Sequence, residues 1–160
     1  MAARKRYWLM KSEPGDFSID DLERVGTEPW TGVRNYQARN FMRQMEVGDL
    51  VFFYHSSTAV PGIAGLAKVA SAPYPDPTQF DRKSDYFDPK ATREQPRWDL
   101  VDVKFEKKFK NVLALGTLKE NEDRLEGLVV LQRGSRLSVQ PVTAPQAREL
   151  LKLAEKNDGK

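Results

Sequence analysis

Two tryptophans and an asparagine carry side chains that could hold a flat heterocycle. Trp30 lies in a predicted loop between a proline and a glycine, Trp98 directly follows a proline-rich segment, and Asn35 comes shortly after Trp30. An indole stacked on a nucleobase contributes about 1–3 kcal/mol, and a side-chain amide offers both a donor and an acceptor to the edge of a base. These residue types suggest a site that binds a base by stacking and hydrogen bonding.

Each of these residues also has a structural interpretation, which the sequence leaves open. Trp30 and Trp98 can pack in the core, and Asn35 can cap a helix that begins at the next residue. Trp8 differs, because it falls in the middle of a predicted strand and we expect it in the core.

Basic side chains lie close to these candidates in the sequence, where phosphate groups beside a bound base would attract them. Arg34 directly precedes Asn35, and Arg39 and Arg43 follow on a predicted helix. We expect Arg39 and Arg43 to contact phosphates. The lysines at positions 107, 108 and 110 are better explained as a solvated surface.

The residues that catalysis would need are scarce. The chain has neither a phosphate-binding G-x-x-x-x-G-K-[ST] loop, nor G-x-G-x-x-G, nor G-x-S-x-G. Its one histidine, His55, stands beside Ser56, and adjacent side chains on a strand point to opposite faces, so the two do not form a catalytic pair. We expect a hydrogen-bonded structural or pocket histidine and no enzymatic activity, and an enzyme acting on nucleic acid through His55 is the weaker alternative.

Composition narrows the protein class further. The chain contains no cysteine, which excludes disulfides, thiolate nucleophiles and cysteine zinc sites, and its carboxylates show no calcium-loop spacing. We therefore expect no cofactor and no metal. A net charge of +3 is a mild bias toward polyanionic partners.

The length and hydropathy of the chain favour one soluble domain. The 160 residues are enough for a single domain over 1–160 with its core at about 6–155. No apolar stretch reaches the length of a membrane span, and no signal-peptide core follows the basic N-terminus. We expect a cytoplasmic protein without a membrane partner, and a monomer because no coiled coil or extended apolar helix is evident.

Apolar periodicity and turn residues predict the elements that would position the candidates. Strands are expected at 6–11, 49–55, 62–70 and 98–109, helices at 18–25, 36–45, 112–120 and 144–156, and loops at 26–32 and 73–96. The glycines at 62 and 65 suggest close backbone approach or a bulge. Strands and helices do not alternate regularly, so the chain is predicted to be an α+β domain built on a small, barrel-like sheet.

Five segments together resemble the EVE domain family. They are YWLMKSEP at 7–14, WTGVRNYQARN at 30–40, GDLVFFYHS at 48–56, GIAG at 62–65 and RLSVQPV at 136–142. The match runs over nearly the whole chain, and several long motifs in one order are far more specific than one short motif. The chain resembles the bacterial, stand-alone form of this family, which is related to thymocyte nuclear protein.

The resemblance implies a PUA-like fold, with a small mixed or antiparallel β-barrel-like sheet and a few short helices, related to the YTH domains that read methylated adenine in RNA. EVE domains are regarded as readers of modified bases. By position, Lys11 and Ser12 would line the floor of the pocket, Trp30 would stack on the base, and Arg34 and Asn35 would contact its edge or the backbone.

The remaining residues carried over from the family would complete the pocket. His55 with Ser56, and Leu137 with Ser138, would close its rim, and Trp98 corresponds to a cage tryptophan of the YTH type. The expected function is therefore binding, without turnover, of a modified base in DNA or RNA. A domain that binds a small molecule or nucleotide is the alternative.

Overall fold

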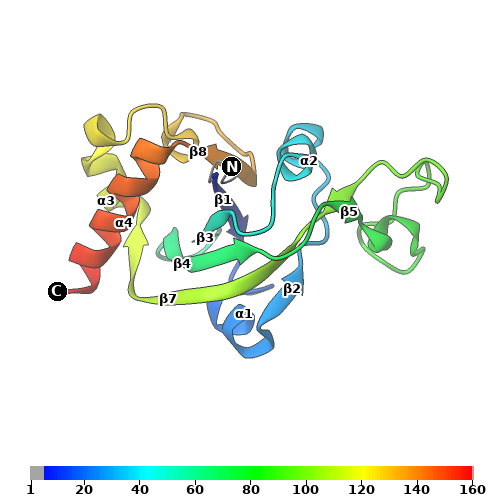
Figure 1. The fold of residues 1–160 in the computed structure, drawn as a ribbon, viewed down its shortest axis with the longest axis horizontal. Coiled ribbons are helices and arrows are strands. Elements are labelled where there is room, and N and C mark those ends of the chain that lie inside the picture. Colours follow the sequence, from blue (N-terminus) through cyan, green and yellow to red (C-terminus); the bar gives the residue numbers. More distant parts are fainter. Residues whose placement is uncertain (1–5, 160) are drawn as a thin grey trace, which may run out of the picture.

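The computed structural model describes residues 6–159 and contains a six-stranded sheet with helices packed on both faces (Figure 1). The strands are β1 (Tyr7–Ser12), β2 (Thr27–Pro29), β3 (Leu50–His55), β4 (Gly62–Val69), β5 (Tyr74–Pro75), β6 (Asp99–Leu100), β7 (Asp102–Ala114) and β8 (Val139–Val142). The α-helices are α1 (Ile19–Val25), α2 (Tyr36–Arg43), α3 (Leu115–Glu120) and α4 (Ala144–Asp158), and short 3₁₀ turns lie at Pro77–Phe80, Glu122–Arg124 and Val129–Leu131.

The sheet is mixed and curled into a half-barrel, as the predicted fold class requires. Its strand order is β2-β7-β4-β3-β1-β8, in which β1 and β3 are parallel and every other pair is antiparallel. Irregularities in the register between β4 and β7 help the long β7 strand to bend. At one of them a side chain on Gly65 would place its Cβ 2.3 Å from the carbonyl oxygen of Lys107, so only glycine fits there.

Two apolar cores lie on opposite faces of the sheet, because β3 is central and apolar on both sides. Phe53 packs in the core that contains Trp8 and residues of α1 and α2. Phe52 packs in the core shared with α3 and α4. Trp8 is 3% exposed, which confirms its predicted place in the interior.

Three of the four predicted helix starts are confirmed by their capping hydrogen bonds. The side chains of Ser18, Asn35 and Thr143 accept hydrogen bonds from the backbone N–H groups of Asp21, Ala38 and Gln146. These caps satisfy N–H groups that have no partner inside the helix.

Three predicted elements differ from the structure. The strand expected at 98–109 is divided into β6, which pairs with β5 in a separate two-stranded sheet, and β7, which begins at Asp102. Residues 112–114, expected in a helix, extend β7, because Leu113 and Ala114 pair with Ile63 and Gly62 of β4, and α3 begins only at Leu115. Residues 27–29, expected in a loop, form the edge strand β2 against β7. These differences come from pairing with strands that are distant in the sequence, which local patterns do not contain.

The topology brings several chain segments to one end of the strands of the sheet. The parallel strands β1 and β3 both end there, and the antiparallel strand β8 begins there. The connection between β2 and α2 lies next to the same end of the strands. Among residues 6–159, no helix is both long and apolar enough to cross a membrane.

Candidate functional site

A cavity of about 610 Å³ opens at the end of the sheet where β1 and β3 end. Its walls come from the end of β1, the residues after β3, the segment from β2 to α2, the residues before β8, and one residue of the 73–96 loop. The lining residues are Lys11, Ser12, Glu13, Asp16, Phe17, Glu28, Pro29, Trp30, Thr31, Gly32, Val33, Arg34, Ser56, Ser57, Tyr86, Ser135, Arg136 and Ser138. Ligand pockets commonly measure roughly 300–1,000 Å³, so a nucleobase fits this volume.

Trp30 borders this cavity and at the same time belongs to the core. Its side chain is 8% exposed, and its ring meets Phe53 edge-on at 5.5 Å between centroids. Its backbone N–H donates to the carbonyl of Val101, the residue directly before β7. The indole is thus held rigidly from behind, with part of its surface facing the cavity.

Tyr86 supplies a second aromatic wall from the long loop. It is 44% exposed, and its ring lies against Gly32, where an added Cβ would come within 2.6 Å of the tyrosine Cζ. Gly32 also has a φ of +88°, a conformation that other residues rarely adopt. Glycine at position 32 therefore allows the tyrosine ring to approach the backbone next to Trp30.

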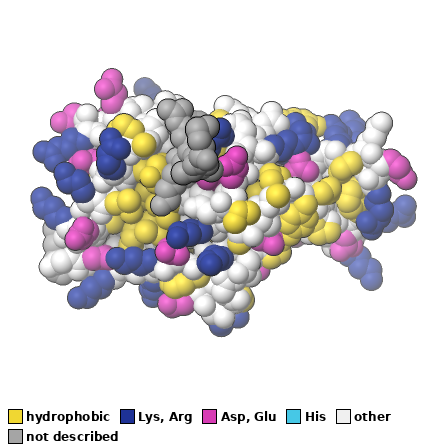
Figure 2. Space-filling view, viewed as in Figure 1, with side chains coloured by type: hydrophobic (Ala, Val, Ile, Leu, Met, Phe, Trp, Pro, Cys, Tyr) yellow, Lys and Arg dark blue, Asp and Glu magenta, His cyan; other side chains and the backbone are white. Residues whose placement is uncertain are grey.

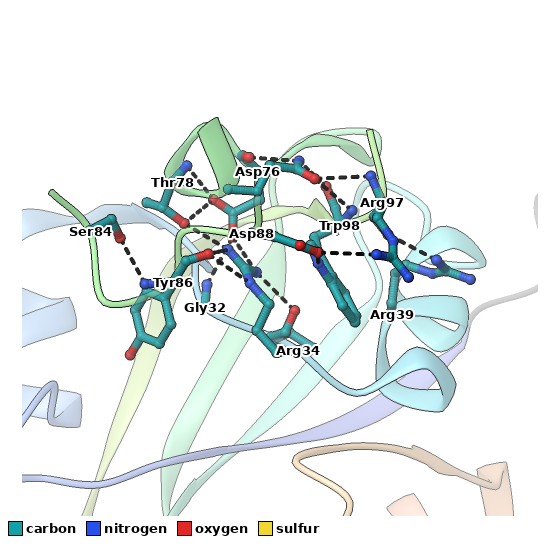
Figure 3. A network of polar contacts seen from close by, with 12 residues as sticks. Gly32, Arg34, Arg39, Asp76, Thr78, Ser84, Tyr86, Asp88, Arg97 and Trp98 are labelled. Atoms are coloured by element: carbon teal, nitrogen blue, oxygen red, sulfur yellow. Dashed lines mark hydrogen bonds and ion pairs between the residues drawn. The ribbon is translucent and has the colours of Figure 1, made fainter. Parts of the chain in front are cut away.

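Arg34 ties this loop to the body of the domain (Figure 3). Every N–H group of its guanidinium has an acceptor within the protein: the carbonyls of Val33 and Tyr86, the carboxylate of Asp76 and the hydroxyl of Thr78. A ligand could therefore bond Arg34 only by replacing one of these contacts. The arrangement indicates that Arg34 positions Tyr86 rather than contacting a base directly.

Asp76 is the buried centre of this network. Its side chain is 0% exposed, and it accepts hydrogen bonds from Gly32 N–H, from Arg34, and from both the N–H and the hydroxyl of Thr78. The carboxylate links the turn at Gly32 to the start of the long loop. The two aromatic walls are in this way connected through one charged hydrogen-bonded cluster.

Two half-buried charged groups in the cavity lack a charged partner among residues 6–159. Lys11 is half-buried, and this burial lowers the pKa of its ammonium group. Glu28 is also half-buried; burial, and secondarily the negative charge of Asp21, raise the pKa of its carboxyl group. Both shifts reflect the cost of holding an ion away from water, which a polar ligand would reduce.

The serines among the predicted site residues line the cavity. Ser12, Ser56 and Ser138 all border it. The Ser12 hydroxyl donates to the carbonyl of Phe17, and the Ser138 carbonyl accepts from the N–H of Lys11. The predicted floor and rim positions at 11, 12, 56 and 138 therefore lie together.

His55 does not line this cavity. Its Nε2 accepts a hydrogen bond from the N–H of Ile19, the first residue of α1, at 3.1 Å, and its ring meets Phe53 edge-on. Burial lowers the pKa of His55, although the charge of Asp20 opposes this effect. The histidine caps a helix, which is one of the two roles expected for it, and it does not lie at the rim of the cavity, where the family resemblance placed it.

Asn35 and Leu137 line an adjacent, smaller groove of about 360 Å³. This groove shares Ser135 and Arg136 with the cavity and also contains Arg133. The side-chain oxygen of Asn35 accepts from Ala38 N–H, so its capping role is confirmed and its amide nitrogen remains available to the groove. No acidic side chain of the described chain lines this groove.

Trp98, Arg39 and Arg43 lie outside both hollows. Trp98 is 6% exposed, stacks on Tyr36 at 4.7 Å and donates from Nε1 to Asp88. Arg39 lies over the Tyr36 ring, and Arg43 pairs with Asp99. The structure brings these residues to the base of the long loop rather than to the cavity.

A protein-family comparison decides which class of domain has this pocket. The family model described as "EVE domain" matches residues 6–153. The chain belongs to the EVE domain family. Thymocyte nuclear protein 1 of Danio rerio is 45% identical to this EVE domain protein over 163 residues, covering 91% of this chain and 71% of the relative.

Solved structures of relatives share the fold of the EVE domain. The human THYN1 protein, in complex with DNA containing 5-methylcytosine, is 41% identical and superposes with a TM-score of 0.90, covering 94% of this chain and 98% of that chain. A YTH domain from Zygosaccharomyces rouxii, in complex with N6-methyladenosine RNA, is 13% identical with a TM-score of 0.50, covering 95% of this chain and 88% of that chain. The second likeness is one of fold.

Sequence reasoning missed several residues that line the pocket of the EVE domain. Glu28 lies in a segment predicted to be a loop, and the strand that aligns it with Trp30 forms only by pairing with β7. Tyr86 carries no comparable signal, since its position depends on a hydrogen-bond network across 52 residues of chain. Arg136 belongs to a motif quoted for the family but was not assigned to the site.

Proposed function

We propose that this EVE domain protein binds a modified nucleobase of DNA or RNA in the cavity beside Trp30, without chemical turnover. The observation that carries the proposal is the meeting of a rigid indole and an exposed tyrosine at one cavity that also holds Lys11 and Glu28. Aromatic faces favour stacking of a base, and polar groups select its edge.

The base would leave its strand to enter the cavity. Extruding a base from a duplex costs on the order of a few kcal/mol, and a single strand reduces this cost. Stacking against the cavity walls would offset it. Because a human relative is solved with DNA containing 5-methylcytosine, we infer that this base is the first ligand to test.

The strand on one side of the base would follow the groove next to the cavity. Arg133 and Arg136 line that groove without an acidic neighbour among its described residues, whereas Glu13 and Asp16 stand at the cavity. Phosphates favour the basic side and are repelled by the acidic one. We infer that Arg133 and Arg136, rather than Arg39 and Arg43, contact the backbone.

Binding of labelled single-stranded oligonucleotides, with cytosine or 5-methylcytosine at one position, tests the proposal. We expect tighter binding of the methylated strand and an unchanged ligand mass after long incubation. Tyr86→Ala should weaken binding by about 5- to 150-fold, which corresponds to the loss of one stacked ring, with little change in stability because the residue is 44% exposed.

Tyr74→Ala is the matched control, because Tyr74 is 37% exposed, lies in the same loop and does not line the cavity. It should leave the affinity unchanged. Equal affinities for wild type and Tyr86→Ala would contradict the proposed pocket. Salt-insensitive binding of a small molecule would instead favour a metabolite-binding domain.

A further inference from the structure

The position of Glu28 couples it to the stacking residue. Glu28 pairs with Val103 of β7 in the edge strand β2, and Trp30 follows two positions later. Residues two apart on an extended chain lie on the same side, and both residues line the cavity. A base resting against Trp30 would therefore present an edge within the same enclosure as the Glu28 carboxylate.

The Glu28 carboxylate has no internal use. Within residues 6–159 no ion pair or side-chain hydrogen bond engages the Glu28 carboxylate. Glu13 and Asp16, the other carboxylates of the cavity, are exposed, whereas Glu28 is half-buried. A partly desolvated carboxylate without a partner is costly, and a ligand with N–H donors would relieve that cost.

We propose that Glu28 accepts a hydrogen bond from the exocyclic amino group of the bound base, so that the pocket selects amino-bearing bases over their keto counterparts. This inference rests on the proposed function. An ionised carboxylate only accepts hydrogen bonds, and pairing of a glutamate with the cytosine amino group is an established kind of contact. A keto oxygen in the same place would face the carboxylate with two acceptors and no proton.

Lys11 complements this selection from another wall of the cavity. Its ammonium group only donates, and it has no ion pair among the described residues. It can therefore pair with a ring nitrogen or a carbonyl oxygen of the same base. Together, one acceptor and one donor match a base edge that carries an amino group next to an acceptor.

The test compares single-stranded oligonucleotides that carry 5-methylcytosine or thymine at one position. These bases share the methyl group and differ in the 4-amino or 4-keto substituent and in N3, which accepts a hydrogen bond in 5-methylcytosine and carries a proton in thymine. In a single strand that edge is free. We expect wild type to prefer 5-methylcytosine by at least about fivefold. Glu28→Gln should bring the affinities for 5-methylcytosine and thymine to within about twofold of each other, because an amide can donate to the keto oxygen.

Glu13→Gln is the matched control, because it removes the same charge from an exposed carboxylate at the same cavity. It should raise both affinities and leave their ratio as in wild type. If Glu13→Gln reduced the ratio of the two affinities as much as Glu28→Gln does, the inference would be overturned in favour of a general charge effect.

Removing the amino group from the base, rather than changing the protein, gives a test that does not depend on whether a variant folds. An oligonucleotide carrying 5-methyl-2-pyrimidinone lacks the amino group, and wild type should bind it at least about fivefold more weakly than 5-methylcytosine. Equal binding of these ligands, or an unchanged ratio in folded Glu28→Gln, overturns the assignment of Glu28 while leaving the base-binding function intact. Failure of wild type to bind any of the oligonucleotides overturns the function itself, and the inference with it.

Discussion

At the scale of single residues, Trp30 is both a wall of the cavity and a part of the core. Its ring packs on Phe53 with only 8% of the side chain exposed. Truncating such an aromatic residue costs about 3–5 kcal/mol of stability. Trp30→Ala would therefore lose binding through unfolding as well as through lost stacking, and Tyr86 is the sharper probe of the site.

His55 is a residue-scale probe of stability against pH. Its Nε2 accepts the Ile19 N–H only while the ring is neutral, and burial lowers the pKa of the histidine in the folded state. The unfolded chain takes up this proton near pH 6.5, so it binds more protons than the folded chain as the pH falls below that value. The contribution of His55 to the free energy of unfolding is thus present above about pH 6.5 and decreases as the pH falls toward the lowered pKa.

We expect urea unfolding at pH 7.5, 6.5 and 5.5 to show this decrease in wild type relative to His55→Gln. The glutamine oxygen can accept the same N–H without titrating, and His55 is the one histidine of the chain. Parallel stability profiles for the two proteins would contradict the capping role.

At the scale of elements, the long loop is ordered by a polar cluster rather than by regular structure. Arg34 and Asp76 join the segment between β2 and α2 to the loop that carries Tyr86 (Figure 3). The loop contributes only the two-residue strand β5 and one 3₁₀ turn to secondary structure. Its conformation therefore depends on the side chains that hold it.

Asp76→Ala should destabilise the protein on the order of 3 kcal/mol, because it leaves the Arg34 guanidinium without its buried partner. Hydrogen exchange of residues 73–96 should rise, and affinity for the oligonucleotide should fall as Tyr86 loses its position. Urea unfolding and exchange mass spectrometry measure these effects.

Arg43→Ala is the control for this prediction, because it removes an ion pair with Asp99 whose arginine side chain is 45% exposed. Its expected cost is below about 1 kcal/mol. A similar loss of stability in both variants would mean that the buried cluster stabilises the protein no more than an exposed ion pair does.

At the scale of the whole molecule, basic and acidic side chains are nearly equal in number. The positive charge that binds a polyanion must therefore be concentrated at the site. The chain has 26 Lys and Arg residues against 23 Asp and Glu residues. On the face shown in Figure 2, basic side chains are interspersed with acidic ones. Affinity for a polyanion should therefore depend on a few residues at the site, such as Arg133 and Arg136.

The double variant Arg133→Ala/Arg136→Ala should weaken binding of cytosine and 5-methylcytosine strands by the same factor. The slope of log K against log salt concentration should become shallower by roughly 1.4, at about 0.7 for each phosphate contact to a single strand. Lys107→Ala/Lys110→Ala removes equal charge from exposed positions outside both hollows and should leave the slope unchanged. An unaltered slope in the arginine variant would contradict the backbone path.

Much of the scaffold could be predicted from local sequence signals. The caps at Ser18, Asn35 and Thr143, the two-sided apolar run of β3 and the close approach at Gly65 follow from residue types over a few positions. Local hydrogen bonds and side-chain periodicity act over this range, so the sequence alone contains them. The same holds for Trp30 as a candidate, since its motif is contiguous.

Part of the composition of the pocket was decided only by the tertiary structure. Glu28, Tyr86 and Arg136 come from three separate segments that meet because β2 pairs with β7 and because Arg34 and Asp76 close the long loop. Trp98 could not be separated from Trp30 by residue type, and only the fold directs it toward Tyr36. Contacts between distant segments depend on long-range pairing and on closure of a hydrogen-bond network, and neither leaves a local pattern.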